Sequence, residues 1–164
     1  MLKNLYQLDR IAGKTIIQFT DNDPTTLNVD AIVEEQDTNL LLGNASVFIE
    51  AIDNYPELLE QMGQQVREIP GNVIVKKSQP KRLIAIVYDV DHTPICEESW
   101  IKEVLDEIIL QCYEHNIKTI AMPLLGTSYG KLSDIQIIDL LQDRLIHNKS
   151  QKPKKILIYN KKGI

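Results

Sequence analysis

The sequence is poor in the residues from which special sites are commonly built, and each scarcity excludes a class of protein. Two cysteines occur among 164 residues, Cys96 and Cys112, and neither stands in a CxxC pair or at ligand spacing from a histidine. A disulfide framework and a zinc site are therefore not expected, and no bound metal ion is predicted. Cys112 is expected to be a reduced thiol in a core.

Long apolar runs are also missing. No stretch of the sequence approaches the roughly 20 apolar residues that are needed to span a bilayer. The first five residues contain no apolar signal core and no cleavage site. The sequence therefore predicts a cytoplasmic protein without a membrane partner.

Positive charge is scarce overall, with 18 Lys and Arg against 23 Asp and Glu, a formal net charge of −5. Because phosphate backbones are held mainly by Lys and Arg, duplex DNA is not expected as a partner. Lysines near the C-terminus reverse this balance locally. They could contact RNA or an acidic partner, or they could simply belong to a solvated sheet edge. The sequence favours the solvated edge. These lysines are Lys149, Lys152, Lys154, Lys155, Lys161 and Lys162.

What is present is typical of one α/β domain over residues 1–164, with 43% hydrophobic and 25% charged residues. Apolar runs of strand length alternate with amphipathic helical patterns, which predicts a largely parallel sheet covered on both faces. The predicted strands are 15–19, 31–33, 73–75, 83–90, 119–122 and 155–159, and the predicted helices are 46–52, 56–66, 100–115 and 133–147. The loops 21–26, 34–46 and 123–130 would face one crevice at the carboxyl ends of the strands. In the last helix, the residues expected to face the core are Ile135, Ile138, Leu141 and Leu145.

A glycine-bracketed turn after the strand 119–122 is the most informative motif. Gly126 and Gly130 permit backbone angles that other residues avoid, so the amides of residues 127–129 could turn toward one anion, with phosphate the obvious guest. Ser133 and Gln136 stand at capping-box spacing, and the positive end of the following helix would add to the attraction. The alternative interpretation is that the glycines only make a strand-to-helix corner.

Three segments together carry a family resemblance: the strand 29–33, the loop from Glu34 through Gly43 to Val47, and the segment 120–130. Over residues 15–145 the chain resembles a divergent macro domain of the ADP-ribose-binding, Appr-1-p-processing type. The resemblance implies a three-layer α/β/α fold with a mostly parallel mixed sheet. It also implies a crevice for ADP-ribose, an ADP-ribosylated substrate or a related pyrophosphate nucleotide, and no cofactor.

The resemblance also implies roles for individual residues. Asp21 is the nearest match to an acidic residue that takes the adenine amino group, with Asp23 as a substitute. The first loop offers a single glycine where the family usually has several. The implied ligand residues of the two loops are Gly43, Asn44, Ala45, Ser46 and Val47, and Gly126, Thr127, Ser128, Tyr129 and Gly130.

The main departure from the family lies at residues 34–37, where hydrolytic members carry an Asn-Ala-Ala-Asn-like segment. Here Asp37 stands at the position of the second asparagine, and an ionised Asp accepts hydrogen bonds but cannot donate them. Glu34, Glu35 or Asp37 could act as a general base, or the cluster could bind a divalent cation that bridges to phosphate. Because charged clusters at strand ends are usually exposed, the sequence favours a solvated acidic turn.

Other candidates are weaker. His92 follows a strand but has no second histidine at ligand spacing, and neither Cys96 nor Ser128 has a recognisable base partner. Three functional hypotheses stay open: a binder of ADP-ribose or a related nucleotide, an ADP-ribosyl or phosphoester hydrolase that uses an acidic residue of 34–37, and an interaction module without a ligand. The sequence favours the hypothesis of a protein that binds ADP-ribose or a related nucleotide. It does not indicate which protein partner, if any, is bound.

Overall fold

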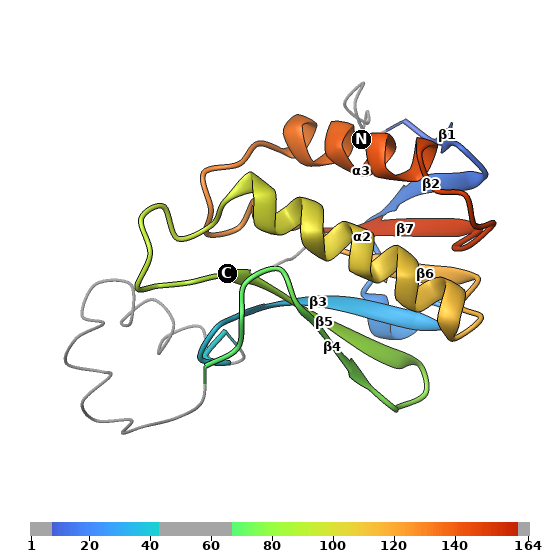
Figure 1. Ribbon diagram of the computed structural model, residues 1–164. Helices are drawn as coiled ribbons and strands as arrows, with labels where there is room; N and C mark the ends of the chain where they lie inside the picture. The colour runs from blue at the N-terminus through green and yellow to red at the C-terminus, as the bar shows by residue number, and fades with distance from the viewer. Residues whose placement is uncertain (1–7, 43–66, 161–164) are drawn as a thin grey trace.

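Seven strands form one mixed sheet in the computed structural model, which describes residues 8–42 and 67–160 (Figure 1). The elements, in chain order, are β1 (Arg10–Ala12), β2 (Thr15–Thr20), the 3-10 helix η2 (Pro24–Thr26), β3 (Ala31–Asp37), β4 (Val73–Lys76), β5 (Lys81–Tyr88), α2 (Glu98–Glu114), β6 (Thr119–Met122), α3 (Asp134–Ile146) and β7 (Lys155–Tyr159). The predicted helices 46–52 and 56–66 lie outside the described residues.

The order of strands across the sheet is β1-β2-β7-β6-β3-β5-β4. The pairs from β2 to β5 are parallel, and the two outermost strands, β1 and β4, pair antiparallel with their neighbours. The five inner strands therefore end at the same edge of the sheet. This edge is where ligand sites of open α/β sheets are found.

Both described helices lie on one face of the sheet, the near side in Figure 1. Helix α2 packs on β5 and β4, α3 packs on β1, and the two helices contact each other. The buried side of α2 consists of Ile101, Val104, Leu105, Ile108, Ile109 and Cys112. Their i, i+3, i+4 spacing makes one apolar stripe, and Cys112 lies in the core as the sequence predicted.

On the other face, Ile32, Ala121 and Tyr159 form a small buried cluster, against which Leu27 and Val29 pack from the segment that precedes β3. This segment covers the centre of the sheet on the side away from the helices. Among the described residues the sheet is thus covered by helices on one face and by an irregular segment on the other.

Several predicted boundaries differ from the structure. The short edge strand β1 was not predicted, because three residues are too few to show a period. Strand β5 spans Lys81–Tyr88 rather than 83–90. In α3 the buried residues are Ile137, Ile138, Leu141 and Leu145, whereas Ile135 is 53% exposed. Ile135 lies in the first turn, at the margin of the apolar stripe, so its expected burial was wrong.

The largest correction concerns β3, which continues through Glu34, Glu35 and Gln36 to Asp37 instead of ending at Val33. The acidic segment is therefore part of a central strand, not a solvated turn. A shift in register between β3 and β5 occurs at Gln36 and Asp37, at the carboxyl end of the pair. Such bulges re-aim side chains near the end of a strand.

The start of α3 confirms the predicted capping box. The Ser133 side chain accepts from Gln136 N, and the Gln136 side chain accepts in return from Ser133 N. This pair satisfies two backbone donors that the first turn would otherwise leave without a partner. The cap holds the beginning of α3 directly beside the glycine-bracketed turn.

Ser133→Ala removes the side-chain acceptor and is expected to lower the free energy of unfolding by about 1 kcal/mol. Ser133→Thr keeps a hydroxyl at the same position and should lose much less. Urea denaturation followed by circular dichroism measures both. An equal loss in the two variants would contradict a capping role for the hydroxyl.

Candidate functional site

A hollow of about 260 Å³ opens at the carboxyl ends of β6 and β7. The turn after β6, the first residue of α3 and the end of β7 contribute its walls. The lining residues are Pro123, Leu124, Thr127, Ser128, Asp134, Tyr159 and Asn160. The hollow thus lies at the edge of the sheet where the sequence predicted a crevice, and two residues of the glycine-bracketed turn line it.

The two glycines of this turn are required for different reasons. Gly126 has a φ of +80°, a conformation that side-chained residues rarely adopt. A Cβ at Gly130 would lie 2.3 Å from the carbonyl oxygen of Gly126 and 2.9 Å from Cys96 Cβ. The turn therefore closes on itself and rests on Cys96, so that only a residue without a side chain fits at its second end.

The amides of the turn do not all face one point, as the motif alone suggested. Thr127 N donates to Leu124 O at 3.4 Å, and Tyr129 N donates to the Tyr88 hydroxyl at 3.4 Å. The Ser128 amide makes no hydrogen bond to another described residue, and the Ser128 side chain is exposed. Among residues 127–129, Ser128 is therefore the one whose amide has no hydrogen bond to another described residue, and Ser128 lines the hollow.

A buried hydrogen bond lies beneath the turn. The Tyr88 hydroxyl, on β5, donates to Glu35 Oε2, on β3, at 2.7 Å, and both side chains are almost fully buried. Burial, and then the nearby Glu35 charge, raise the pKa of Tyr88 above its usual range. The rings of Tyr88 and Tyr129 meet edge to face, with centroids 5.8 Å apart. The turn is thus fixed through Tyr88 to the carboxyl end of β5 and to Glu35 of β3.

The other acidic residues of β3 also have partners. Glu34 forms an ion pair with Arg82 of β5, with 2.5 Å between Oε2 and Nη2. Asp37 is fully buried, and its two carboxylate oxygens accept from the amides of Asn39, Leu41 and Leu42. Burial raises the pKa of Asp37, although these three hydrogen bonds act in the opposite direction. The carboxylate of Asp37 therefore organises the first turn after β3.

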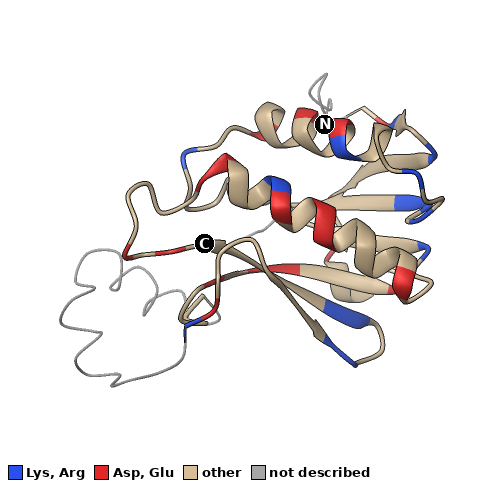
Figure 2. Cartoon of the chain, viewed as in Figure 1, with Lys and Arg blue, Asp and Glu red and all other residues tan. Residues whose placement is uncertain are grey.

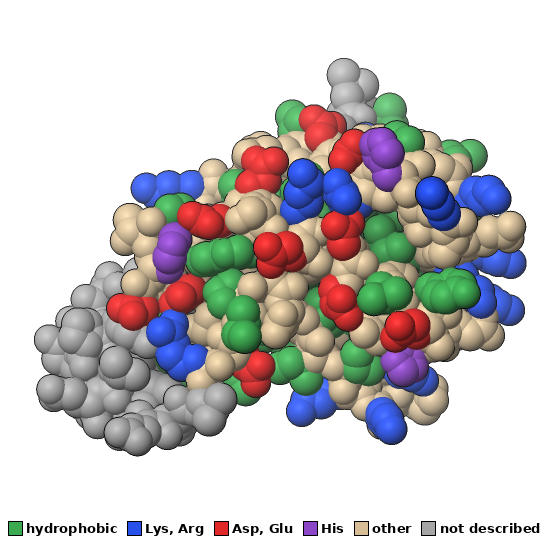
Figure 3. All heavy atoms as spheres, viewed as in Figure 1, with side chains coloured by type: hydrophobic (Ala, Val, Ile, Leu, Met, Phe, Trp, Pro, Cys, Tyr) green, Lys and Arg blue, Asp and Glu red, His purple; other side chains and the backbone are tan. Residues whose placement is uncertain are grey.

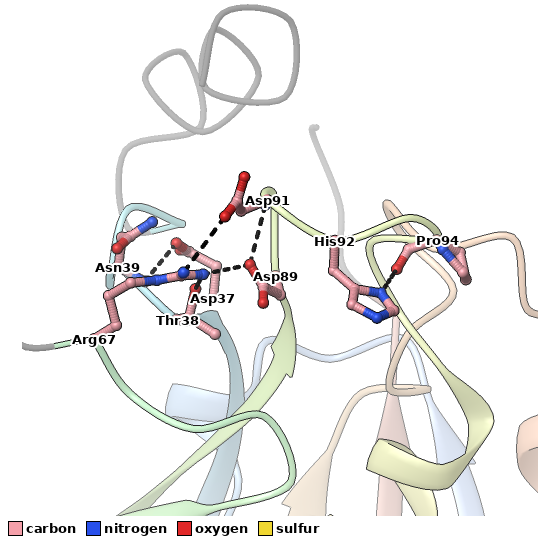
Figure 4. A network of polar contacts seen from close by, with 8 residues as sticks. All are labelled: Asp37, Thr38, Asn39, Arg67, Asp89, Asp91, His92 and Pro94. Atoms are coloured by element: carbon pink, nitrogen blue, oxygen red, sulfur yellow. Dashed lines mark hydrogen bonds and ion pairs between the residues drawn. The ribbon is translucent and has the colours of Figure 1, made fainter. Parts of the chain in front are cut away.

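An arginine joins the carboxyl ends of β3 and β5 (Figure 4). Arg67 Nη2 donates to Asp89 Oδ1 at 2.5 Å and to Thr38 Oγ1 at 3.1 Å. A longer ion pair, 3.7 Å, connects Arg67 Nη1 to Asp91 Oδ2. Arg67 thereby offsets part of the negative charge at this edge.

His92 lies beside this network, and Figure 4 shows its ring turned toward Pro94. Its Nδ1 is 2.7 Å from the Pro94 carbonyl oxygen, which requires the proton to be on Nδ1. Its ring also meets that of Trp100 edge to face. No group of three or more His, Cys, Asp or Glu within residues 8–42 and 67–160 is arranged to hold a metal ion.

The remaining predicted site residues have simple surroundings. Asp21 is exposed, and its Oδ1 accepts from Asn160 Nδ2 at 3.1 Å, at the margin of the hollow. Asp23 caps η2 through hydrogen bonds from the Thr25 amide and hydroxyl, which lower the pKa of Asp23. Burial raises the pKa of the Cys96 thiol to about 12, so Cys96 is not a nucleophile at neutral pH. Gly43, Asn44, Ala45, Ser46 and Val47 lie outside the described residues.

Sequence reasoning missed Tyr159 and Asn160, which line the hollow, and Arg67, which bridges two strands. Tyr159 and Asn160 stand at the end of a predicted strand, and that position was a usable signal. The Tyr159 hydroxyl donates to Val33 O at 2.8 Å and so joins β7 to β3. Arg67 carried no signal, because its partners lie more than 20 residues away in the sequence.

Comparison with known proteins identifies the fold. No family model and no curated protein matches the sequence. Among solved structures, the macrodomain of Thermus aquaticus DarG has 17% sequence identity and a TM-score of 0.58, over 87% of this chain and 97% of that one. The macrodomain of Mycobacterium tuberculosis DarG has 17% sequence identity and a TM-score of 0.59, over 91% of this chain and 99% of that one. A variant of the Oceanobacillus iheyensis macrodomain solved with ADPR has 12% identity and a TM-score of 0.66, over 93% and 89%.

The protein therefore has the α/β macrodomain fold, as the sequence resemblance implied. The similarity extends over most of both chains in each comparison. No helix within the described part of the chain is long and apolar enough to cross a membrane.

Gly130→Ala is expected to lower the free energy of unfolding by about 1–3 kcal/mol, because its Cβ would overlap the Gly126 carbonyl and the turn would have to open. Ser128→Ala, in the same turn but exposed, is the matched control and should be nearly neutral. Thermal and urea denaturation measure both. A neutral Gly130→Ala would show that the closed form of the turn is not needed.

The buried Asp37 makes a prediction about pH. Because its pKa in the folded protein is raised above the ordinary 3.8, Asp37 favours folding most at low pH. That contribution is lost as pH rises through the folded pKa. Asp37→Asn removes this titration, so the unfolding free energy of the wild type minus that of Asp37→Asn should fall as pH rises from about 4 toward about 7. Urea denaturation at several pH values measures the difference, and a constant difference would contradict the prediction.

Proposed function

We propose that this protein binds ADP-ribose, or a nucleotide with a similar pyrophosphate, at the carboxyl ends of β6 and β7. The observation that carries the proposal is the hollow between the glycine-bracketed turn, the start of α3 and the end of β7. A macrodomain with the same fold was solved with ADPR, which supports this class of ligand.

The residues around the hollow suit the two chemical parts of such a ligand. The available amide of Ser128 and the first turn of α3 offer donors and a positive dipole end to a phosphate. Asp21 and Asn160 present oxygen and nitrogen atoms at the margin of the hollow, where an adenine amino group needs an acceptor. Tyr159 supplies an apolar surface beside them.

The charge of this edge argues for binding through the backbone instead of through lysines. Carboxylates surround the strand ends, among them Asp21, Asp89, Asp91 and Asp134. These carboxylates raise the electrostatic cost of bringing a pyrophosphate to the site. Oriented amides offset that cost over short distances without adding a mobile side chain.

The hydrolase hypothesis gains no support from the acidic residues named for it. Glu34 is held by Arg82, the Glu35 carboxylate accepts from Tyr88, and both oxygens of Asp37 accept from backbone amides. A general base must reach the water that it activates, and these three carboxylates are already engaged. We therefore propose that the protein binds its ligand and that residues 34–37 do not catalyse hydrolysis of it. We further propose that the protein is cytoplasmic and that its ligand is free ADP-ribose or ADP-ribose attached to a carrier.

Isothermal titration with ADP-ribose tests the proposal, with AMP and ADP for comparison. Micromolar binding is expected, near −8 kcal/mol. Ser128→Asp places a negative charge beside the proposed phosphate position and should weaken ADP-ribose binding at least about tenfold.

The matched control is Ser78→Asp, the same change in the exposed turn between β4 and β5, at the opposite edge of the sheet. It should leave binding unchanged. If no nucleotide binds to the folded wild-type protein, the interaction-module hypothesis replaces this one. If both variants weaken binding equally, the ligand does not lie beside Ser128.

A further inference from the structure

The charges of this protein are separated along the direction of the strands. Figure 2 shows basic residues gathered at the amino-terminal ends of the parallel strands, whereas the hollow lies at the carboxyl ends of β6 and β7. They come from four separate connections: β1 to β2, β4 to β5, α2 to β6 and α3 to β7. We call this surface the basic end; its lysines are Lys14, Lys76, Lys77, Lys81, Lys118, Lys149, Lys152, Lys154 and Lys155.

The described carboxylates at the basic end, such as Asp30 and Glu114, form no ion pair with its lysines. Within residues 8–42 and 67–160, none of its lysines forms an ion pair. The nearby carboxylate of Asp30 accepts instead from the backbone amides of Lys118 and Thr119, at 2.8 and 3.2 Å. Lys152 donates to Asn116, which is uncharged. The positive charges therefore face solvent, and Figure 3 shows several of them along one margin of the helix-covered face.

The overall negative charge does not cancel this surface. Strand β5, with 8 residues, separates the two ends by about 26 Å. The Debye length at 0.1 M salt is about 10 Å, so the carboxylates near the hollow are screened from a partner at the other end. A net charge of −5 for the whole chain thus hides a local excess of positive charge.

We infer that the basic end binds the phosphate backbone of duplex nucleic acid. From β2 to β5 the parallel strands make four steps of about 4.8 Å, so that their lysines form a band roughly 19 Å wide. Duplex nucleic acid offers a phosphate charge every 1.7 Å or so of its axis, and several phosphates lie within that width. This inference does not depend on the ligand proposed for the hollow.

The composition of the basic end favours a nucleic acid over other anionic partners. Within the described residues its four connecting turns carry no exposed large apolar side chain, and those nearest to them, Ile11, Ile16, Tyr113 and Ile146, come from separate strands and helices. Protein interfaces are depleted in lysine and rich in aromatic residues. Stable attachment to a lipid surface needs an apolar anchor in addition to basic residues. Single-strand binding uses successive aromatic side chains for stacking, and Tyr113 is the one exposed aromatic side chain beside the basic end among the described residues, so the duplex is the partner that this surface fits better.

Fluorescence anisotropy with a short labelled DNA duplex tests this inference in the full chain. The expected result is micromolar binding at about 50 mM salt that weakens steeply toward about 200 mM. The double variant Lys118→Glu and Lys154→Glu should bind at least about tenfold more weakly, with a salt slope lower by about two. Both side chains are exposed, so circular dichroism should show an unchanged fold.

The matched control is Lys102→Glu with Lys131→Glu, two exposed lysines outside the basic end, which should reduce duplex binding far less. Saturating ADP-ribose should not change duplex affinity, so this result is separable from the function proposed for the hollow. The inference is overturned if the wild type does not bind the duplex, or if both double variants lose affinity equally. Binding to phosphatidylserine vesicles or polyglutamate in place of the duplex would also overturn it, in favour of a membrane or an acidic protein.

Discussion

The hydrogen bond from Tyr88 to Glu35 is the contact on which the candidate site depends. It joins β3 to the carboxyl end of β5, and the same hydroxyl accepts from the amide of Tyr129 in the glycine-bracketed turn. A buried carboxylate without such a partner would carry a large desolvation cost. Three segments far apart in the sequence are therefore held at one edge of the sheet.

The polar contacts above this bond continue the same pattern. Asp37 accepts from three amides of the next turn, and Arg67 connects that turn to the end of β5. Carboxylates in this region are used to organise backbone and to pair with arginine. The surface that they build is negative, while the lysines gather at the other end of the strands. The phosphate proposed for the hollow would therefore be held through amides, whereas the duplex inferred as a partner would meet the lysines at the opposite end.

Much of the fold could be predicted from the sequence because its signals are local. The runs 119–122 and 155–159 coincide with β6 and β7, and the capping box of Ser133 and Gln136 is present as predicted. The glycine-bracketed turn was placed correctly at the carboxyl end of β6. By contrast, residues 34–37 were interpreted as a turn, since charged residues rarely occupy a buried strand. Their partners, Arg82 and Tyr88, lie 48 and 53 residues further along the chain, where no local pattern could reveal them.

The sequence by itself determined the alternation of strands and helices, the apolar side of α2 and the glycines that make the turn, because each depends on spacing between near neighbours. Only the tertiary structure decided that the Tyr129 amide faces Tyr88, that Asp37 is buried, and that Tyr159 and Asn160 complete the hollow. It also decided that lysines from four connections share one end. These features arise when parallel strands bring distant residues to a common edge. The overall composition does not reveal them, because it carries no information on which residues lie together.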